Sequence, residues 1–337
     1  MTSSLKIQNL NKQFKRGGLI FGTKITAVEN VNIELPAGKP WIMSIVGESG
    51  SGKSTLAMMV LRLLDMTSGD IFIDEKPLSC YRHNKTEFYK KVQPIFQNPF
   101  SAFSSRRRVD AYLYSTAMKL GGAQNRIKAK AMIEEALESV GLDYQTVEGK
   151  YPNQFSGGEL QRISIARALI TRPSLIVADE PVAMIDASLR TNIVNLFKKI
   201  KDEYNVNFIY ITHDLSTAYY VSDYIATLYR GNLIEFGNAQ EVLNEPAHPY
   251  TRLLLDSVPR VGAKWEDDFI LPDMETKEYG LAGCKFANRC PYAKEVCRTK
   301  RPPSIQKSGS HMILCYKYND YNEMTFSATE GDIIKKI

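Results

Sequence analysis

A glycine-rich stretch near residue 50 has the residue types and the spacing that hold nucleotide phosphates. It satisfies the pattern G-x-x-x-x-G-K-[ST] and consists of Gly47, Glu48, Ser49, Gly50, Ser51, Gly52, Lys53, Ser54 and Thr55. Glycines let the backbone turn N–H groups toward phosphate oxygens, and the following helix adds the partial positive charge of its N-terminus. Lys53 is expected to reach the β- and γ-phosphates, and Ser54 to bind Mg²⁺ through its hydroxyl. The stretch predicts a site for a nucleoside triphosphate.

Two carboxylates follow an apolar run, residues 175–178, that has the length of a buried strand. A phosphate-binding loop needs such a carboxylate, at the end of a neighbouring strand, to hold the metal ion. Asp179 is predicted to coordinate Mg²⁺, directly or through water, and Glu180 to polarise an attacking water. An Asp-Glu pair at a strand end is more often a helix cap or an ion pair, but the upstream loop favours the catalytic interpretation.

A second candidate anion site precedes a helical pattern and consists of Ser156, Gly157, Gly158 and Glu159. It offers a hydroxyl and backbone N–H groups at a positive helix end. Because the chain's own phosphates already have a site, we interpret this second surface as serving the nucleotide of another subunit.

Two further polar residues follow strand-like segments. Gln97 is expected to reach the metal or the attacking water. His213 follows an apolar run and should lie at the same sheet edge. A lone histidine after a strand is usually structural, but its order and spacing here favour contact with the γ-phosphate.

The elements that must position these residues alternate between short apolar segments and helical patterns, which predicts an α/β fold with a largely parallel sheet. Strands are predicted at 5–10, 27–35, 41–46, 70–74, 92–96, 175–178, 207–212, 224–229 and 232–236. Helices are predicted at 54–64, 127–140, 160–170 and 188–200. Residues from about 100 to 170 are helix-rich and are interpreted as an insertion between two halves of one core. Residues 257–282 look like a linker.

Length, apolar runs and net charge argue against a membrane-spanning protein and against a nucleic-acid-binding one. The 337 residues predict about two domains, and no apolar run approaches the roughly 20 residues of a membrane span. The N-terminus lacks the pattern of a signal peptide, so we expect a soluble, cytosolic chain. The net charge of +6 is weakly basic, and the densest basic run is only Arg106–Arg108, so no nucleic-acid partner is expected.

Four of the five cysteines fall within 54 residues near the C-terminus: Cys284, Cys290, Cys297 and Cys315. Four thiolates suit zinc or an iron–sulfur cluster. Structural zinc usually uses tighter pairs of the type C-x₂₋₄-C, which this segment lacks, and a reducing cytosol disfavours disulfides. Cys80 stands alone and is expected to be a packed structural thiol.

Taken together, the ordered motifs over about residues 1–250 resemble those of ABC-transporter ATP-binding subunits. The resemblance implies a P-loop NTPase, RecA-like cassette with a helical subdomain at about 100–170 and a C-terminal extension at 251–337. It also implies a head-to-tail pair of subunits that enclose two ATP molecules, with residues 156–159 acting on the partner's ATP. Glu180 would then be the general base, His213 would contact the γ-phosphate, and Gln97 would link the site to a membrane subunit.

One aromatic residue near the N-terminus also matches the family pattern. Phe14 corresponds to the residue that stacks on adenine in such subunits. The alternative is a core or edge aromatic of the first sheet.

Residues 151–158 and 247–254 are similar to those of the oligopeptide/dipeptide permease group, and residues 179–182 resemble its F-type subunit. Two positions depart from the family pattern. Ala183 replaces a common serine, which puts one cross-interface hydrogen bond in doubt, and Glu159 replaces the commonest glutamine. Members of this group carry a similar cysteine tail, so the resemblance implies a [4Fe–4S] cluster, with zinc and metal-free or oxidised thiols as alternatives.

The resemblance predicts an active ATPase that binds ATP and Mg²⁺ and drives uptake through an ABC transporter. Expected partners are a second ATPase subunit of the D type, two membrane permease subunits and, through the complex, an extracellular or periplasmic solute-binding protein. The chain is then expected at the cytoplasmic face of the cell membrane. Relatives of this type carry peptides, oligosaccharides or nickel, and a soluble ABC ATPase or a non-hydrolysing subunit are the other hypotheses.

Overall fold

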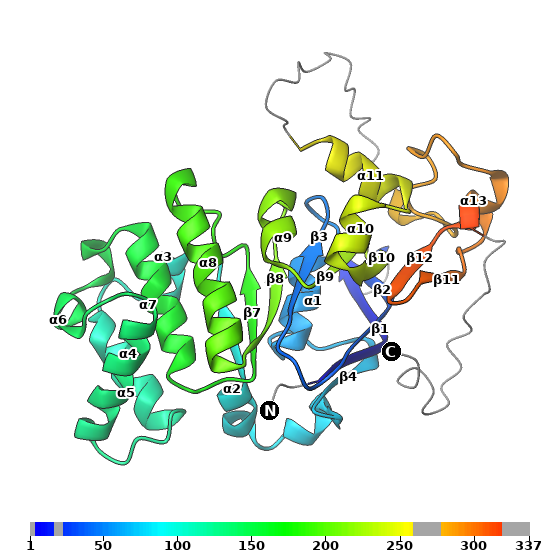
Figure 1. Cartoon of the computed structure of the whole chain (residues 1–337). Coiled ribbons are helices and arrows are strands. Elements are labelled where there is room, and N and C mark those ends of the chain that lie inside the picture. The colour runs from blue at the N-terminus through cyan, green and yellow to red at the C-terminus, as the bar shows by residue number, and fades with distance from the viewer. Residues whose placement is uncertain (1–3, 17–22, 259–277, 319–337) are drawn as a thin grey trace.

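The computed structural model describes residues 4–16, 23–258 and 278–318 (Figure 1). Its centre is an eight-stranded sheet with the strand order β11-β12-β10-β9-β3-β8-β7-β6. These strands are β3 (Ile42–Val46), β6 (Val92–Ile95), β7 (Leu175–Asp179), β8 (Asn207–Ile211), β9 (Tyr224–Tyr229), β10 (Asn232–Asn238), β11 (Ser304–Ser308) and β12 (His311–Leu314). The neighbours from β9 to β6 pair in parallel, which confirms the predicted α/β fold.

The parallel strands are mostly apolar, as expected where helices cover both faces of a sheet, although they also bury Ser44, Gln93, Asn207 and Thr227. Every residue of β3 and β8 is buried. Because parallel strands end at a common edge, the loops after β3, β6, β7 and β8 meet there. Residues 47–55, Gln97, Glu180 and His213 follow these four strands, and Asp179 is the last residue of β7, so the sheet brings this part of the predicted site together.

A smaller antiparallel sheet covers one side of the molecule and has the order β2-β1-β4-β5. Its strands are β1 (Leu5–Arg16), β2 (Thr23–Leu35), β4 (Ser68–Ile73) and β5 (Lys76–Pro77). Helix α1 (Lys53–Val60) shares one hydrophobic core with both sheets. The predicted helix 54–64 ends earlier, since Arg62 adopts a left-handed conformation with φ of 55° that stops helical hydrogen bonding.

The helix-rich segment forms the end of the molecule opposite the C-terminal extension (Figure 1). It contains α3 (Pro99–Ala102), α4 (Val109–Lys119), α5 (Arg126–Ser139), α6 (Tyr144–Val147) and α7 (Gly157–Leu169). These helices share a core with α8 (Ala187–Tyr204). Helix α4 had no sequence prediction, because its buried face consists only of Val109, Leu113 and Ala117.

Short helices complete the chain: α2 (Lys85–Lys91), α9 (Leu215–Val221), α10 (Ala239–Asn244), α11 (Pro249–Asp256) and α13 (Glu295–Thr299). In the described ranges, no helix combines the length and the apolar character needed to cross a membrane.

The C-terminal extension continues the central sheet. Strand β12 pairs antiparallel with β10, where Glu235 faces Ile313 in the register. The fully buried Glu235 carboxylate lies 2.7 Å from His311 Nε2 and accepts backbone N–H bonds from Ala247 (2.7 Å) and His248 (3.0 Å). The hairpin of β11 and β12 had no sequence prediction, because its four- and five-residue strands lack a clear alternation of apolar and polar residues.

Two sequence predictions need correction. Cys80 is exposed, and so is not a packed thiol, because it lies in a short surface turn before α2. The predicted linker 257–282 includes residues 259–277, which lie outside the described residues, but its last part is packed. Glu278 is 2% exposed because its carboxylate pairs with Arg230.

We predict that Glu235→Ala lowers the free energy of unfolding by about 3 kcal/mol, because it leaves buried donors without an acceptor. Urea denaturation followed by circular dichroism measures the change. The matched control is Glu245→Ala, which removes a surface pair with Lys307 in which the Glu245 side chain is 79% exposed. The control should change stability by less than about 1 kcal/mol, and equal effects of the two substitutions would contradict the prediction.

Candidate functional site

The loop from Gly47 to Gly52 leaves β3 and leads into α1, and it packs closely against neighbouring backbone. Gly47 has φ of 148° and Gly52 has φ of 103°, values that side chains rarely allow. A Cβ on Gly47 would lie 2.2 Å from the carbonyl oxygen of Leu228 on β9. A Cβ on Gly52 would lie 2.4 Å from the carbonyl oxygen of Ala27 on β2. Glycine is therefore required at both ends of the loop.

Lys53 is buried beneath this loop, with 7% of its surface exposed. Its ammonium donates to the carbonyl oxygens of Gly47 (2.6 Å) and Glu48 (2.8 Å). Burial lowers the pKa of Lys53, although the nearby carboxylates of Glu180, Asp179 and Glu48 act in the opposite direction. The ammonium is thus held inside the loop by two carbonyl oxygens, which phosphate oxygens could replace as acceptors.

A hydroxyl and a carboxylate face each other beside the lysine. Ser54 Oγ donates to Asp179 Oδ1 over 3.4 Å. Burial raises the pKa of Asp179, and the Ser54 hydrogen bond and the Lys53 charge offset this only in part. Hydroxyl and carboxylate oxygens are the ligands that Mg²⁺ prefers, so Ser54 and Asp179 fit a magnesium site.

Glu180 is held by two side chains from neighbouring loops. Its Oε2 accepts from Gln97 Nε2 over 3.0 Å, and its Oε1 lies 3.1 Å from His213 Nδ1. The backbone of Glu180 has φ of 45°, a strained value of the kind found at functional sites. Three residues that the sequence placed after three different strands are therefore brought together around the Glu180 carboxylate.

Phe14 lies on β1 and is 39% exposed, so it is not a core residue. The ammonium of Lys12 lies 5.1 Å from the centre of its ring. The adenine-stacking role of Phe14 stays a prediction.

Ser156, Gly157, Gly158 and Glu159 form the start of α7, away from the residues above. Ser156 caps the helix, because its Oγ accepts from Glu159 N–H while the Glu159 carboxylate accepts from Ser156 N–H and Oγ. The Ser156 backbone N–H bond is the main cause that lowers the pKa of Glu159. Ser156, Gly158 and Glu159 line a cavity of about 480 Å³ whose lining includes Arg162 and Lys199 but none of residues 47–55.

The turn that contains Ala183 connects these two regions. Ala183 N–H donates to the Glu180 carbonyl over 3.1 Å. At the other side, the Met184 carbonyl would lie 3.2 Å from a Cβ added to Gly157. The turn therefore contacts both the Glu180 segment and the start of α7.

The four late cysteines line one cavity of about 250 Å³, together with His248. Burial raises the pKa of Cys284 to about 12 and also raises the pKa values of Cys290 and Cys315. Yet within the described ranges, no three histidine, cysteine, aspartate or glutamate side chains converge closely enough to hold a metal ion. The arrangement therefore brings the thiols around one space without forming a ready site for a single ion.

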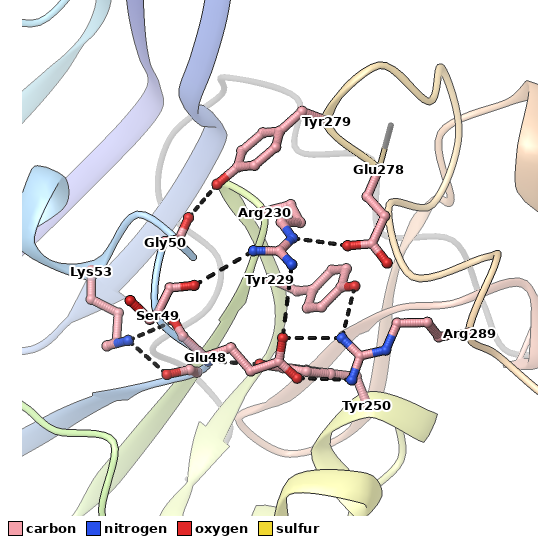
Figure 2. A network of polar contacts seen from close by, with 11 residues as sticks. Glu48, Ser49, Gly50, Lys53, Tyr229, Arg230, Tyr250, Glu278, Tyr279 and Arg289 are labelled. Carbon is pink, nitrogen blue, oxygen red and sulfur yellow. Dashed lines mark hydrogen bonds and ion pairs between the residues drawn. The ribbon is translucent and has the colours of Figure 1, made fainter. Parts of the chain in front are cut away.

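Sequence reasoning missed a set of residues that contact the phosphate-binding loop from outside (Figure 2). Tyr250 Oη accepts from Glu48 N–H over 2.8 Å. Arg230, Tyr279 and Arg289 also bond to residues 48–50 of this loop. These contacts join residues about 180 to 240 positions apart, so no local sequence pattern could have indicated them.

Comparisons with known proteins agree with this geometry. The family model described as "ABC transporter" matches residues 28–183, and "Oligopeptide/dipeptide transporter, C-terminal region" matches residues 234–297. The oligopeptide transport ATP-binding protein AppF of Bacillus subtilis (strain 168) is 33% identical, covering 94% of this chain and 97% of the relative. The oligopeptide transport ATP-binding protein OppF of Haemophilus influenzae is also 33% identical, covering 93% and 96%.

Solved structures of ATP-binding cassettes are similar as well. The ATP-binding cassette MJ0796, in a dimeric post-hydrolysis state bound to ADP and Pi, has a TM-score of 0.61 at 28% identity and covers 70% of this chain and 98% of that one. The cbiO1 protein of Clostridium perfringens, part of the transporter complex cbiONQ, has a TM-score of 0.62 at 25% identity and covers 78% and 98%.

We predict that Gly52→Ala destabilises the chain by about 3 kcal/mol, since the added methyl group meets a backbone carbonyl in a left-handed conformation. Nucleotide binding should be lost with it, measured by titration with a fluorescent ATP analogue. Gly149→Ala is the matched control, because Gly149 also has positive φ (75°) but no atom lies within 4 Å of the added Cβ. The control should cost about 1 kcal/mol and leave binding intact, and retained binding in Gly52→Ala would refute the steric argument.

Proposed function

The chain belongs to the ABC transporter family, among the ATP-binding subunits of the oligopeptide/dipeptide type, and we propose that it powers peptide import through membrane-embedded partners. The family makes it a transport ATPase that uses ATP and Mg²⁺. Peptide is the cargo that the names of its relatives give, which supports the same cargo here. The observation that carries the catalytic proposal is the Glu180 carboxylate, held by both Gln97 and His213.

We propose these roles for the chain's own residues. Residues 47–55 bind the phosphates through backbone N–H groups, and Lys53 exchanges its two carbonyl acceptors for phosphate oxygens. Mg²⁺, held by Ser54 and Asp179, would neutralise charge on the phosphates. Glu180 accepts a proton from the attacking water, with His213 close to the γ-phosphate. Stabilisation of charge, and not covalent chemistry, then accounts for catalysis.

The residues at the start of α7 act on a different nucleotide from the one bound at Lys53. Ser156, Gly158 and Glu159 line a cavity that includes none of residues 47–55. This supports a second ATPase subunit, proposed to be a D-type chain, whose bound nucleotide these residues would contact. Two permease subunits and an external solute-binding protein complete the proposed complex. The chain would then lie at the cytoplasmic face of the cell membrane, attached through the permease subunits.

The four late cysteines are proposed to hold a [4Fe–4S] cluster. Their shared cavity of about 250 Å³ supports a group larger than a single ion, and four thiolates are a usual ligand set for such clusters. A bound cluster would cross-link separate turns of the extension. The thiols would have to move together to reach it, because none of the described groups is already arranged as a metal site.

We predict that Glu180→Gln keeps ATP binding but lowers hydrolysis by about 100-fold or more in the assembled transporter, because the amide cannot accept the proton. Phosphate release at saturating ATP measures turnover, and an ATP-analogue titration measures binding. Glu203→Gln, an exposed change on α8, is the matched control and should keep full turnover. Hydrolysis by Glu180→Gln at the wild-type rate would show that the general base is another group.

We predict that anaerobically purified protein contains about four iron atoms per chain and absorbs visible light as iron–sulfur proteins do. Cys290→Ser should lose both signals, whereas the control Cys80→Ser should keep them, because Cys80 is exposed and outside the cavity. Zinc without iron, measured by elemental analysis, would contradict the cluster.

A further inference from the structure

The cysteine-bearing extension contacts the phosphate-binding loop directly. Arg289 donates two hydrogen bonds to the Glu48 carboxylate, from Nη2 to Oε1 over 2.9 Å and from Nη1 to Oε2 over 3.0 Å. Tyr279 Oη donates to the Gly50 carbonyl oxygen. Figure 2 shows these side chains approaching residues 48–50 from the side of the extension. Two separate residues of the extension thus contact two positions of the loop, Glu48 and Gly50.

The negative charge of Glu48 opposes phosphate binding, and Arg289 neutralises that charge. Its carboxylate belongs to the loop that must accept the negative charge of ATP phosphates, so an unneutralised Glu48 would repel them. Arg289, whose side chain is 11% exposed, pairs with Glu48 through both nitrogens, and Arg230 Nη2 lies 4.0 Å away. Arg230 itself pairs with buried Glu278 at 2.9 Å, so Arg289 is the cation chiefly directed at Glu48.

Packing fixes the position of Arg289. Phe286, three residues earlier, is 2% exposed and packs against both Tyr229 and Tyr250, whose ring centres lie 5.3 and 5.4 Å from its own. Arg289 N–H donates to the Phe286 carbonyl over 3.0 Å, and its Nη1 lies 3.2 Å from Tyr229 Oη. Burial opposes the charge of Arg289, but its bonds to Glu48 and Tyr229 outweigh this and raise its pKa. A buried aromatic cluster therefore presents a permanently charged guanidinium to the loop.

The second contact, between Tyr279 and the Gly50 carbonyl oxygen, sets the orientation of a peptide group in the loop. In a trans peptide the carbonyl and the next N–H point in opposite directions. Tyr279 holds the Gly50 carbonyl and Arg230 lies 3.5 Å from the Ser49 carbonyl oxygen, both on the side of the extension. The N–H groups of Gly50 and Ser51 are therefore turned away from the extension. This is the orientation that a phosphate-binding loop needs, and Ser51 N–H points to the same side as the Lys53 ammonium, since both donate to the Glu48 carbonyl oxygen.

We propose that Arg289 and Tyr279 are positioning residues of the nucleotide site, through which the C-terminal extension sets the affinity of this chain for ATP. Arg289 neutralises Glu48 beside the bound phosphates, and Tyr279 keeps the loop peptide in its binding orientation. The proposal rests on the proposed ATP site at residues 47–55. It assigns the extension a role in nucleotide binding in addition to any role of its thiols.

The principal test is Arg289→Met, which keeps an unbranched, largely apolar stem but removes the guanidinium and its charge. ATP-analogue binding by the full chain should weaken about tenfold, which corresponds to about 1.4 kcal/mol. In the assembled transporter the KM for ATP should rise by a similar factor, with kcat at saturating ATP nearly unchanged. The matched control is Arg298→Met, the same charge change at an exposed position of α13, and it should leave both constants unchanged.

A second substitution shows whether Arg289→Met weakens ATP binding through the lost charge or through a general loss of structure. Adding Glu48→Gln to Arg289→Met removes the unpaired carboxylate and should recover most of the lost affinity. A purely structural role predicts no recovery. The defect of Arg289→Met should also shrink in 1 M salt, because screening lengths fall from about 10 Å at 0.1 M to about 3 Å.

Tyr279→Phe tests the second contact even if Arg289→Met folds poorly, because it removes a single oxygen. It should weaken binding about threefold, with an unchanged circular dichroism spectrum. Wild-type affinity in both Arg289→Met and Tyr279→Phe would overturn the inference while leaving the proposed ATP site intact. Failure of the wild-type chain to bind ATP would overturn both.

Discussion

The close approach of the phosphate-binding loop to neighbouring backbone is the constraint on which the site depends. Gly47 and Gly52 lie so near the carbonyls of Leu228 and Ala27 that only hydrogen fits in place of a side chain. These carbonyls belong to different sheets, so the loop can form only when both sheets are packed around α1. Folding of the whole cassette therefore creates the anion site, and the lysine beneath it becomes buried in the same step.

The remaining polar residues of the site are brought together at the edge where the parallel strands end. Asp179 ends β7 and Glu180 follows it, Gln97 follows β6 and His213 follows β8, and these three strands are neighbours in the sheet. Adjacent strands bring their ends within hydrogen-bond distance without any special local sequence. The start of α7 lies in the helical part and lines its own cavity, which includes none of residues 47–55.

The C-terminal extension is part of this construction and not an independent attachment. Its hairpin continues the central sheet through the buried pair of Glu235 and His311. Its aromatic cluster, centred on Phe286, packs on β9 and α11 and places a guanidinium against the loop. The cavity lined by the four cysteines borders the same cluster through His248. The thiol region and the nucleotide site thus share one packed layer of side chains.

The sequence alone determined the parallel α/β fold, the helical insertion and the phosphate-binding loop, because strand periodicity and short motifs act over few residues. It also determined that Glu180, Gln97 and His213 would meet, since each follows a predicted strand. Helix α4, the β11–β12 hairpin and the packing of Glu278 were not predictable, because their signals are weak or distant. Only the tertiary structure decided that Arg289 pairs with Glu48, 241 positions away. Such a contact depends on how separate elements pack, and no local pattern of residue types encodes it.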